Sequence, residues 1–440
     1  MITVHHSPKL VGRLLVGGSK NYTSRYVLAA TLAEGVSVLR NPADIDDARV
    51  MVTCCTRLGA RIERVPDGLV VTGTGGHLLS PGELNVGNAG AVARFLMAIA
   101  ATLPAPTRFT TPYPESLGRR PHHDLLQALS SLGCHCESQD GRLPIAVSGG
   151  LHRGGRVCVS GATSSQFSTA LLFLAPLLSG ITHIEVCGPQ RSAPLLKQTL
   201  EVLQATGIEV THQGLRNFRV TGPQSYRAGD HFIPGDWPGA AAILAAAAVV
   251  ESDVVLTGLS DDAQGERAIV NVLQAMGADV VFDRAARHVR MRGGRPLRAV
   301  EFDGDQATDA VMAMVAAACF ADGTSRFTNI ENLRYKESDR ISDYCRELAK
   351  MGAQLEETRD SITVHGNPEP LPGGVTVDAH HDHRLLMGAT IVALRCKQPV
   401  RLTGAQHIAK SYPSFFTDLQ RLGAYVSATC NSPTSTNQSR

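Results

Sequence analysis

The chain has 440 residues, of which 43% are hydrophobic and 19% are charged, and its formal net charge is +2. These values are ordinary for a globular protein of about two or three domains, and they give no electrostatic case for nucleic-acid or membrane binding. The first residues lack a secretory pattern, and no uninterrupted apolar run reaches the ~18 residues of a membrane span. We therefore expect a cytoplasmic protein that binds small molecules, with no nucleic-acid or membrane partner.

The ten cysteines favour free thiols over disulfides. Several of them lie inside apolar helix or strand patterns, as expected for small side chains in a reducing cytoplasm. Cys134 and Cys136 lie close together, but no second cysteine pair has zinc-finger spacing, so no metal site is expected there. The cysteines inside apolar patterns are Cys158, Cys187, Cys319 and Cys396.

A glycine-centred motif recurs along the chain. Each copy ends an amphipathic segment, which we expect to be an outer helix, and a strand-like segment follows it. Glycine suits the left-handed position that ends a helix. Units of about 70 to 75 residues therefore fill the chain as one repeated architecture. The motif glycines are Gly59, Gly133, Gly207, Gly277, Gly352 and Gly423.

Each unit also contains a second expected helix that is apolar on nearly all sides. A helix without a polar face has to be covered all round, so we expect these helices to be the inner ones. In chain order, the inner helices are expected within residues 24–35, 91–103, 167–180, 239–250, 309–323 and 383–394.

A segment of polar, small or charged residues precedes each inner helix. Helix N-termini bind anions because they present unpaired N–H groups and a partial positive charge. Simple capping does not explain Lys20 and Arg384, which oppose the helix dipole unless an anion is present. If the inner helices point one way, their N-termini converge on a site for phosphate and carboxylate groups. The segments are 17–21, 87–90, 163–166, 234–239, 304–309 and 380–384, and Arg25, Arg340 and Lys410 add positive charge.

The last of these segments reads HHDHR. Taken alone, His380, His381 and His383 suggest a metal site. As the sixth member of the set, the segment is instead interpreted as an anion-facing helix start with no metal. A metal hydrolase that uses these histidines is kept as an alternative.

Motifs throughout the chain resemble those of the enolpyruvyl transferases, and more closely their 5-enolpyruvylshikimate-3-phosphate synthase branch than their UDP-N-acetylglucosamine branch. The blocks NLRYKESDR (332–340) and DHR (382–384) are highly specific for the shikimate branch. The resemblance implies an α/β fold, a two-domain inside-out α/β barrel of six βαβαββ-type units, three per domain. It implies one domain at 19–233, another at 1–18 plus 234–440, and an active site in the cleft between them.

The resemblance also implies an activity. Family members move the enolpyruvyl group of phosphoenolpyruvate to an acceptor hydroxyl by addition and elimination, release phosphate and need no cofactor. Asp309 matches the base, Lys20 and Glu337 match the proton-transfer groups at the methylene carbon, and His383 lies near the leaving phosphate. The implied phosphoenolpyruvate ligands are Lys20, Gly90, Gln166, Arg340, Arg384 and Lys410. The implied acceptor ligands are Asn21, Arg25, Ser164, Ser165, Gln166, Ser192, Asp309, Asn332 and Lys336.

Four positions depart from the shikimate pattern and lead us to expect another phosphorylated acceptor. The ligands for an acceptor phosphate mostly remain, while one of two contacts to the shikimate carboxylate is changed. We therefore expect UMP as acceptor, through its 3′-hydroxyl, as in a family branch of nucleoside antibiotic biosynthesis. Arg119 is a candidate replacement for an arginine lost from the same loop. The departures are Asn21, Ala91, Ser116 and Leu195.

Two further readings stay open within the same fold. One is a 3-phosphoshikimate 1-carboxyvinyltransferase of the shikimate pathway, with shikimate 3-phosphate as acceptor and the four departures as tolerated changes. The other is a non-catalytic anion-binding protein, which the changes at Ala91 and Ser116 suggest. The joint retention of Asp309 and Glu337 argues against the second reading.

Overall fold

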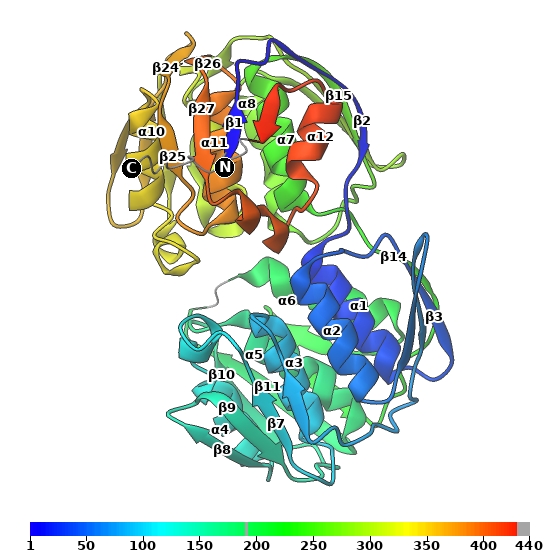
Figure 1. Ribbon diagram of the computed structural model, residues 1–440. Helices are drawn as coiled ribbons and strands as arrows, with labels where there is room; N and C mark the ends of the chain where they lie inside the picture. The colour runs from blue at the N-terminus through cyan, green and yellow to red at the C-terminus, as the bar shows by residue number, and fades with distance from the viewer. Residues whose placement is uncertain (190–191, 429–440) are drawn as a thin grey trace, which may run out of the picture. The chain divides into compact units, whose positions relative to one another are not determined.

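The computed structural model describes residues 1–189 and 192–428. The chain forms two compact units, one coloured from blue to green in Figure 1 and the other from green to red with the blue strands β1 and β2. The α1–α6 unit comprises Val16–Asp236 and Gly258–Gly265, and the α7–α12 unit comprises Met1–Leu15, Trp237–Thr257 and Glu266–Arg440.

These ranges differ from the expected domain boundaries chiefly at residues 258–265, which group with the α1–α6 unit. Hydrogen bonds explain this placement. The Gln264 side chain donates to the Gly235 carbonyl at 2.9 Å, and the Gly235 amide donates to the Gly258 carbonyl at 2.8 Å. The Ala263 amide also donates to the Tyr22 hydroxyl at 3.3 Å.

The α1–α6 unit repeats one βαβαββ arrangement three times. Each repeat has a four-stranded sheet in which the outer parallel pair is followed by two antiparallel pairs. The sheet orders are β14-β3-β5-β4, β6-β7-β9-β8 and β10-β11-β13-β12. The helices are α1 (Lys20–Leu32), α2 (Asp46–Arg57), α3 (Gly90–Ala100), α4 (His123–Ser131), α5 (Ser165–Leu174) and α6 (Ala193–Ala205), with 3-10 turns η1 (Leu117–Arg119) and η2 (Ala175–Leu177). The strands are β3 (Val36–Arg40), β4 (Arg61–Val65), β5 (Gly68–Thr72), β6 (Glu83–Asn85), β7 (Thr107–Thr110), β8 (His135–Gln139), β9 (Arg142–Ser148), β10 (Arg156–Ser160), β11 (Gly180–Cys187), β12 (Thr211–Gln213), β13 (Asn217–Gly222) and β14 (Asp230–Phe232).

The α7–α12 unit has the same threefold plan, and the N-terminal strands β1 and β2 complete two of its sheets. The sheet orders are β16-β17-β15-β2, β19-β21-β23-β22 and β25-β27-β1-β28. The helices are α7 (Trp237–Val249), α8 (Ile269–Ala275), α9 (Val311–Ala318), α10 (Ser342–Lys350), α11 (His383–Ala393) and α12 (Phe415–Arg421), with 3-10 turns η3 (Gly265–Ala268), η4 (Gly304–Gln306), η5 (Glu331–Tyr335) and η6 (Ala405–Lys410). The strands are β1 (Ile2–Val4), β2 (Lys9–Leu15), β15 (Glu251–Thr257), β16 (Asp279–Asp283), β17 (His288–Arg292), β18 (Leu297–Arg298), β19 (Glu301–Asp303), β20 (Ala321–Asp322), β21 (Thr324–Thr328), β22 (Gln354–Glu357), β23 (Ile362–His365), β24 (Leu371–Gly373), β25 (Thr376–Asp378), β26 (Cys396–Gln398), β27 (Val400–Thr403) and β28 (Val426–Ala428).

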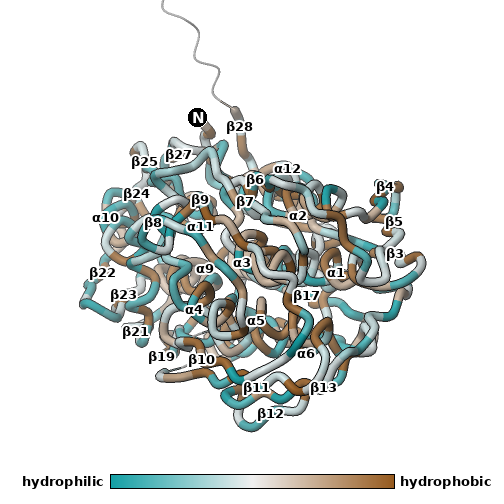
Figure 2. The backbone as a smooth tube through the Cα atoms, turned by 90° about the horizontal axis from the view of Figure 1, so that it is seen from below, coloured by the Kyte–Doolittle hydropathy of each residue, from teal (hydrophilic) through white to brown (hydrophobic). Residues whose placement is uncertain are grey.

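The first helix of each repeat is an inner helix, as the sequence predicts. Every residue of α7, α9 and α11 is buried, and α9 packs against both other helices. In the other unit α3 packs against α5, and hydrophobic residues are frequent along α5 and α9 in Figure 2. The second helices bury only one face, as α10 does with Tyr344, Cys345, Glu347 and Leu348. The inner helices are apolar all round because other elements cover every side of them.

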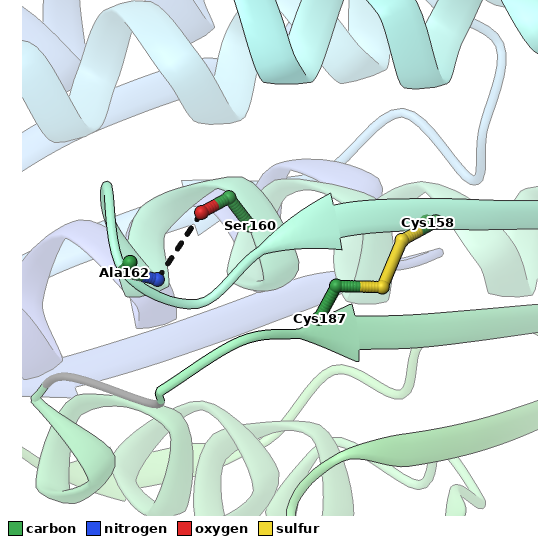
Figure 3. The surroundings of a disulfide bond; sticks show 4 residues. All are labelled: Cys158, Ser160, Ala162 and Cys187. Carbon is green, nitrogen blue, oxygen red and sulfur yellow. Dashed lines mark hydrogen bonds between the residues drawn. A yellow bond between two sulfur atoms is a disulfide. The ribbon is translucent and has the colours of Figure 1, made fainter.

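The cysteines differ from the expectation at one pair. Cys158 on β10 and Cys187 on β11 form a disulfide across two neighbouring parallel strands, as Figure 3 shows. The prediction of free thiols is therefore wrong for these two residues. The other cysteines that the structure describes are free.

No helix in the described part of the chain is long and apolar enough to cross a membrane.

Candidate active site

A buried guanidinium organises a set of charged residues in the α7–α12 unit. Arg340 is 1% exposed, and its Nε donates to Asp382 Oδ2 at 2.7 Å. Its Nη1 donates to Asp309 Oδ1 at 2.9 Å, and its Nη2 donates to Glu337 Oε2 at 2.8 Å. Burying this charge is tolerable because three carboxylates surround the planar fork at hydrogen-bonding distance.

Two further cations border the same carboxylates. Lys410, at the end of η6, donates from Nζ to Glu337 Oε1 at 2.5 Å. Arg384 Nη2 lies 3.6 Å from Asp309 Oδ2, and the residue is only 5% exposed. The buried Nε of Arg384 has no hydrogen-bond partner among the described residues. An uncompensated buried N–H is costly, so this donor is suited to a ligand oxygen.

Asp382 positions this set from the start of α11. Its side chain caps the helix by accepting from the Arg384 amide at 2.8 Å, and it also accepts from Ser338 Oγ at 3.2 Å. The preceding His380 and His381 have φ values of 47° and 59°, which side-chain-bearing residues rarely adopt. This left-handed turn places the Asp382 carboxylate against the Arg340 guanidinium and the Arg384 backbone amide. Asp382 is not among the site residues expected from the sequence.

The acids and bases of this set are held in defined charge states. Burial would raise the pKa of Asp309, but Arg384, Arg340 and Lys336 hold it far below its usual range. Burial would also raise the pKa of Glu337, and the positive charges of Arg340 and Lys410 outweigh it in the same way. Both carboxyl groups are therefore ionised at neutral pH. Burial, with Arg384 and Arg340, lowers the pKa of His383, which is therefore neutral.

The three histidines near α11 have different surroundings. His380 Nε2 lies 3.1 Å from Glu347 Oε1, and His381 Nδ1 lies 2.9 Å from His407 Nε2. His383 is buried, and its Nδ1 has no hydrogen-bond partner among the described residues. The described residues contain no group of three or more His, Cys, Asp or Glu arranged to hold a metal ion. These histidines do not form a shared ligand set.

The remaining expected residues of this unit lie beside η5. Lys336 follows η5, is exposed, and is close enough to lower the pKa of Asp309. Asn332 lies within η5, and its buried Oδ1 has no hydrogen-bond partner among the described residues. Both residues therefore have polar groups that are not used up by internal hydrogen bonds.

A second set of cations lies in the α1–α6 unit. Lys20 begins α1, and its Nζ lies 3.5 Å from Asp47 Oδ2. Arg25, one turn further on, is 1% exposed. It donates to Thr199 Oγ1 at 2.9 Å and to the carbonyls of Asn21 and Leu195 at 2.8 Å and 3.1 Å. These partners are all neutral, and burial lowers the pKa of Arg25 to about 10.

The altered position Leu195 reaches Arg25 through its backbone oxygen, so a change of side chain there leaves this hydrogen bond intact. Asn21 likewise uses its carbonyl, one turn before Arg25. Ala91 lies in the first turn of α3 and packs against the hydrophobic core. The hydrogen bonds of Arg25 therefore do not depend on which side chain stands at positions 21 and 195.

A third arginine, Arg94, holds the start of α5. Its Nη1 donates to Gln166 Oε1 at 2.7 Å and to Ser164 Oγ at 3.2 Å, and its Nη2 donates to the Pro121 carbonyl at 3.2 Å. Ser164 also caps α5 by accepting from the Gln166 amide at 3.2 Å. Burial and the neighbouring Arg120 lower the pKa of Arg94 to about 10. The sequence analysis had not selected Arg94.

Arg120, and not Arg119, lies against the start of α3. A Cβ atom added to Gly90 would lie 3.3 Å from Arg120 Nη1 and 3.8 Å from Gln166 Oε1, so glycine permits this approach. Arg119 instead pairs with Glu115 and has an exposed side chain. Arg120 therefore lies closer than Arg119 to the expected phosphoenolpyruvate ligands Gly90 and Gln166, and its replacement of the arginine expected at Ser116 stays a prediction. Arg119 and Arg120 are adjacent in the sequence, so only the directions of their side chains distinguish the two candidates.

The other two expected acceptor ligands lie at helix starts of the same unit. Ser165 is the first residue of α5 and is 5% exposed. Ser192 immediately precedes α6 and has a left-handed φ of 55°. Each unit thus gathers its expected site residues near the N-termini of inner helices and the turns beside them.

This fold and these charge clusters define an enolpyruvyl transferase. The chain belongs to the EPSP synthase (3-phosphoshikimate 1-carboxyvinyltransferase) family, whose model matches residues 4–419. It is 48% identical to the 3-phosphoshikimate 1-carboxyvinyltransferase of Deinococcus radiodurans, over 97% of this chain and 98% of that protein. Identity to the enzyme of the same name from Burkholderia pseudomallei is 36%, over 97% and 95% of the chains.

Solved structures agree with this assignment. An EPSP synthase from Acinetobacter baumannii superposes with a TM-score of 0.86 at 26% identity, covering 97% of this chain and 99% of that chain. The enolpyruvyl transferase NikO from Streptomyces tendae has a TM-score of 0.78 at 19% identity, covering 97% and 98%. The second likeness shows the shared fold alone.

The protein is thus a carboxyvinyltransferase, which sets aside the non-catalytic and metal-hydrolase alternatives. The expectation of UMP as acceptor has no support from these relatives. The comparisons favour the alternative of a 3-phosphoshikimate 1-carboxyvinyltransferase of the shikimate pathway over the UMP expectation. The four departures from the shikimate pattern do not outweigh this likeness.

Proposed function

We propose that the protein transfers the enolpyruvyl group of phosphoenolpyruvate to a hydroxyl of shikimate 3-phosphate and releases inorganic phosphate. The observation that carries this proposal is the Arg340 cluster, in which three carboxylates and the cations Arg384 and Lys410 share one small volume. Such a set can bind a carboxylate, accept a hydroxyl proton and protonate a carbon. The names of the 3-phosphoshikimate 1-carboxyvinyltransferases supply the acceptor.

In the addition step, Asp309 accepts the proton of the acceptor hydroxyl while the oxygen bonds to C2 of phosphoenolpyruvate. Glu337 or Lys20 supplies a proton to the methylene carbon, which becomes a methyl group. In the elimination step, the methyl group returns a proton to the group that supplied it, and the C2–O bond to phosphate breaks. Phosphate leaves with the bonding electrons, and the enol ether forms. General acids and bases held at hydrogen-bonding distance typically contribute about 10²- to 10⁴-fold to such steps.

The substrate changes the charge balance that the cluster needs for this chemistry. Without substrate, Glu337 is a poor acid because Arg340 and Lys410 hold it ionised. A substrate carboxylate at Lys410 and Arg384 neutralises part of that positive charge. The pKa values of Glu337 and Asp309 then rise, so proton transfer becomes favourable when phosphoenolpyruvate is bound.

The α1–α6 unit supplies the anion-binding groups for the same reaction. Lys20, Arg120 and Gln166 are assigned to the phosphate of phosphoenolpyruvate. Ser164, Ser165 and Ser192 are assigned to the phosphate of the acceptor, together with Asn332 and Lys336 of the other unit. Arg25, a buried cation with neutral partners, is assigned to the acceptor carboxylate, where an anion relieves the cost of its burial.

Phosphate release from phosphoenolpyruvate tests the proposal with three acceptors in parallel: shikimate 3-phosphate, UMP and UDP-N-acetylglucosamine. We expect turnover with shikimate 3-phosphate alone. Asp309→Asn should lower kcat by about 10²-fold or more. The matched control Asp253→Asn removes a surface carboxylate that pairs with Arg290 at 2.6 Å in the same unit, and it should retain wild-type rates. Turnover with UMP but not shikimate 3-phosphate would refute the proposal.

A further inference from the structure

The disulfide lies near the ends of two strands, each of which precedes serines assigned to the acceptor phosphate. Cys158 is two residues before the end of β10, and Cys187 is the last residue of β11. Ser160 pairs with Cys187 in the parallel register, so both cysteine side chains lie on the same face of the sheet. That face is exposed at both cysteines, while Val157, Val159 and Val186 point into the core.

Each strand continues into residues assigned to the acceptor phosphate. After β10, the turn of residues 161–163 leads to Ser164 and Ser165 at the start of α5. After β11, the chain reaches Ser192, which precedes α6. A link between the two strand ends therefore fixes the distance between the starting points of both turns.

Hydrogen bonds connect the linked strands to the α5 turn. The Gly161 amide donates to the Cys187 carbonyl at 2.8 Å, directly across from the disulfide. The Ala162 amide donates to Ser160 Oγ at 3.2 Å, which Figure 3 shows beside the cysteine pair. Two residues after Ala162, Ser164 Oγ accepts from Arg94 Nη1 at 3.2 Å, so the turn of residues 161–163 is held at both of its ends.

The sulfur atoms are also within reach of an external reagent. A hollow of ≈ 570 Å³ is lined by both cysteines together with Ser160 and, from α4, by Asp124, Gln127 and Ser131. An exposed disulfide is the kind that exchanges with thiols, whereas a buried one is protected. The other described cysteines are buried, except Cys136, which is partly buried.

We infer that Cys158 and Cys187 form a thiol–disulfide exchange site that controls binding of the phosphorylated acceptor. In the reducing step, a thiolate of a dithiol reductant attacks one sulfur and the Cys158–Cys187 bond breaks. The second thiol of the reductant resolves the mixed disulfide, so the reductant becomes a disulfide and the protein gains two thiols. Reduction releases the strand ends, and the turn of residues 161–163 then has to be ordered by the acceptor itself.

The first test counts thiols in the full-length enzyme purified without reductant. The protein is denatured and alkylated with iodoacetamide, with and without prior dithiothreitol, and weighed by mass spectrometry. We expect two more alkylated cysteines after reduction, and peptide mapping should place them at Cys158 and Cys187. An equal count in both samples would overturn the inference.

The second test compares kinetics of the oxidised and the dithiothreitol-treated folded enzyme. We expect the KM for shikimate 3-phosphate to rise about two- to tenfold on reduction, because binding then has to supply the free energy of ordering a few side chains. The KM for phosphoenolpyruvate should change little. Cys158→Ser should have the raised KM without reductant and no further response. Cys136→Ser, a matched control on β8, should respond as the wild type does. An unchanged KM for the acceptor would overturn control by the disulfide.

This inference rests on the proposed function for its choice of acceptor, so a readout without turnover is needed. Amide hydrogen exchange of residues 161–166 should become faster after reduction, because their anchoring at Cys187 is loosened. If exchange changes but shikimate 3-phosphate gives no turnover in either state, the proposed function fails and the redox coupling stands. Unchanged exchange would refute the coupling, whatever the activity.

Discussion

Replacing Asp382 by asparagine isolates the role of charge at the centre of the Arg340 cluster. Asp382 is 0% exposed and accepts from Arg340 at 2.7 Å, from Ser338 at 3.2 Å and from the Arg384 amide at 2.8 Å. Asparagine keeps an oxygen for the helix cap but loses the charge-assisted bond to Arg340. Such a bond contributes about 1.5–3 kcal/mol. The 3–5 kcal/mol of a fully broken buried pair is an upper bound, because Arg340 retains two carboxylates.

If the whole of this energy orients the cluster in the transition state, Asp382→Asn lowers kcat/KM about 10- to 150-fold. The assay is phosphate release with shikimate 3-phosphate, combined with thermal unfolding of the same preparations. Asp418→Asn is the matched control, since Asp418 is 6% exposed in the same unit and bonds Ser414 and Arg421 outside the cluster. A variant that loses stability but keeps kcat/KM within twofold of the wild type would show that Asp382 only supports the fold.

Three more outcomes follow from individual contacts. Arg120→Ala should raise the KM for phosphoenolpyruvate about tenfold or more, because Arg120 lies beside Gly90. Arg119→Ala should leave this KM unchanged, because Arg119 pairs with Glu115. Equal effects of both variants in steady-state kinetics would contradict the assignment. Burial raises the pKa of Asp262 to about 7, so the folded state favours its protonated form. The free energy of unfolding of the wild type should therefore fall as pH rises from about 4 to 7. Urea titrations should show that Asp262→Asn removes this dependence on pH. Gly388→Ala would place a Cβ 2.0 Å from the Tyr344 hydroxyl, and overpacking of about 1–3 kcal/mol should lower the melting temperature.

The architecture could be predicted because the amino-acid sequence contains a repeated pattern. The glycine spacing gives the repeats, and segments without a polar face give the inner helices, whose burial follows directly. The sequence pattern does not show which sheets the strands β1, β2 and β14 join. Each of them pairs with a strand that is far away in the sequence. Nothing in the local pattern of such short strands specifies a distant partner.

The individual site residues came from two sources. The charge pattern indicated Arg340, and the resemblance to the family indicated Asp309. The structure joins these two residues at 2.9 Å, and their roles in the reaction stay predictions. Arg119 and Arg120 could not be separated, because they differ only in the direction that the 3-10 turn η1 gives each side chain. The disulfide was missed since Cys158 and Cys187 lie 29 residues apart and become neighbours only through parallel strand pairing.

The charges of the free enzyme also explain why catalysis should wait for substrate. In the Arg340 cluster each carboxylate already has a cation within 3.6 Å, so neither Asp309 nor Glu337 acts as a strong base or acid before a ligand arrives. A substrate carboxylate competes for Arg384 and Lys410, and its own charge raises the pKa values of both acids. Substrate binding and the activation of Asp309 and Glu337 therefore result from the same change in local charge. A neutral amide analogue of the substrate carboxylate should lose kcat as well as affinity, because it cannot shift these pKa values.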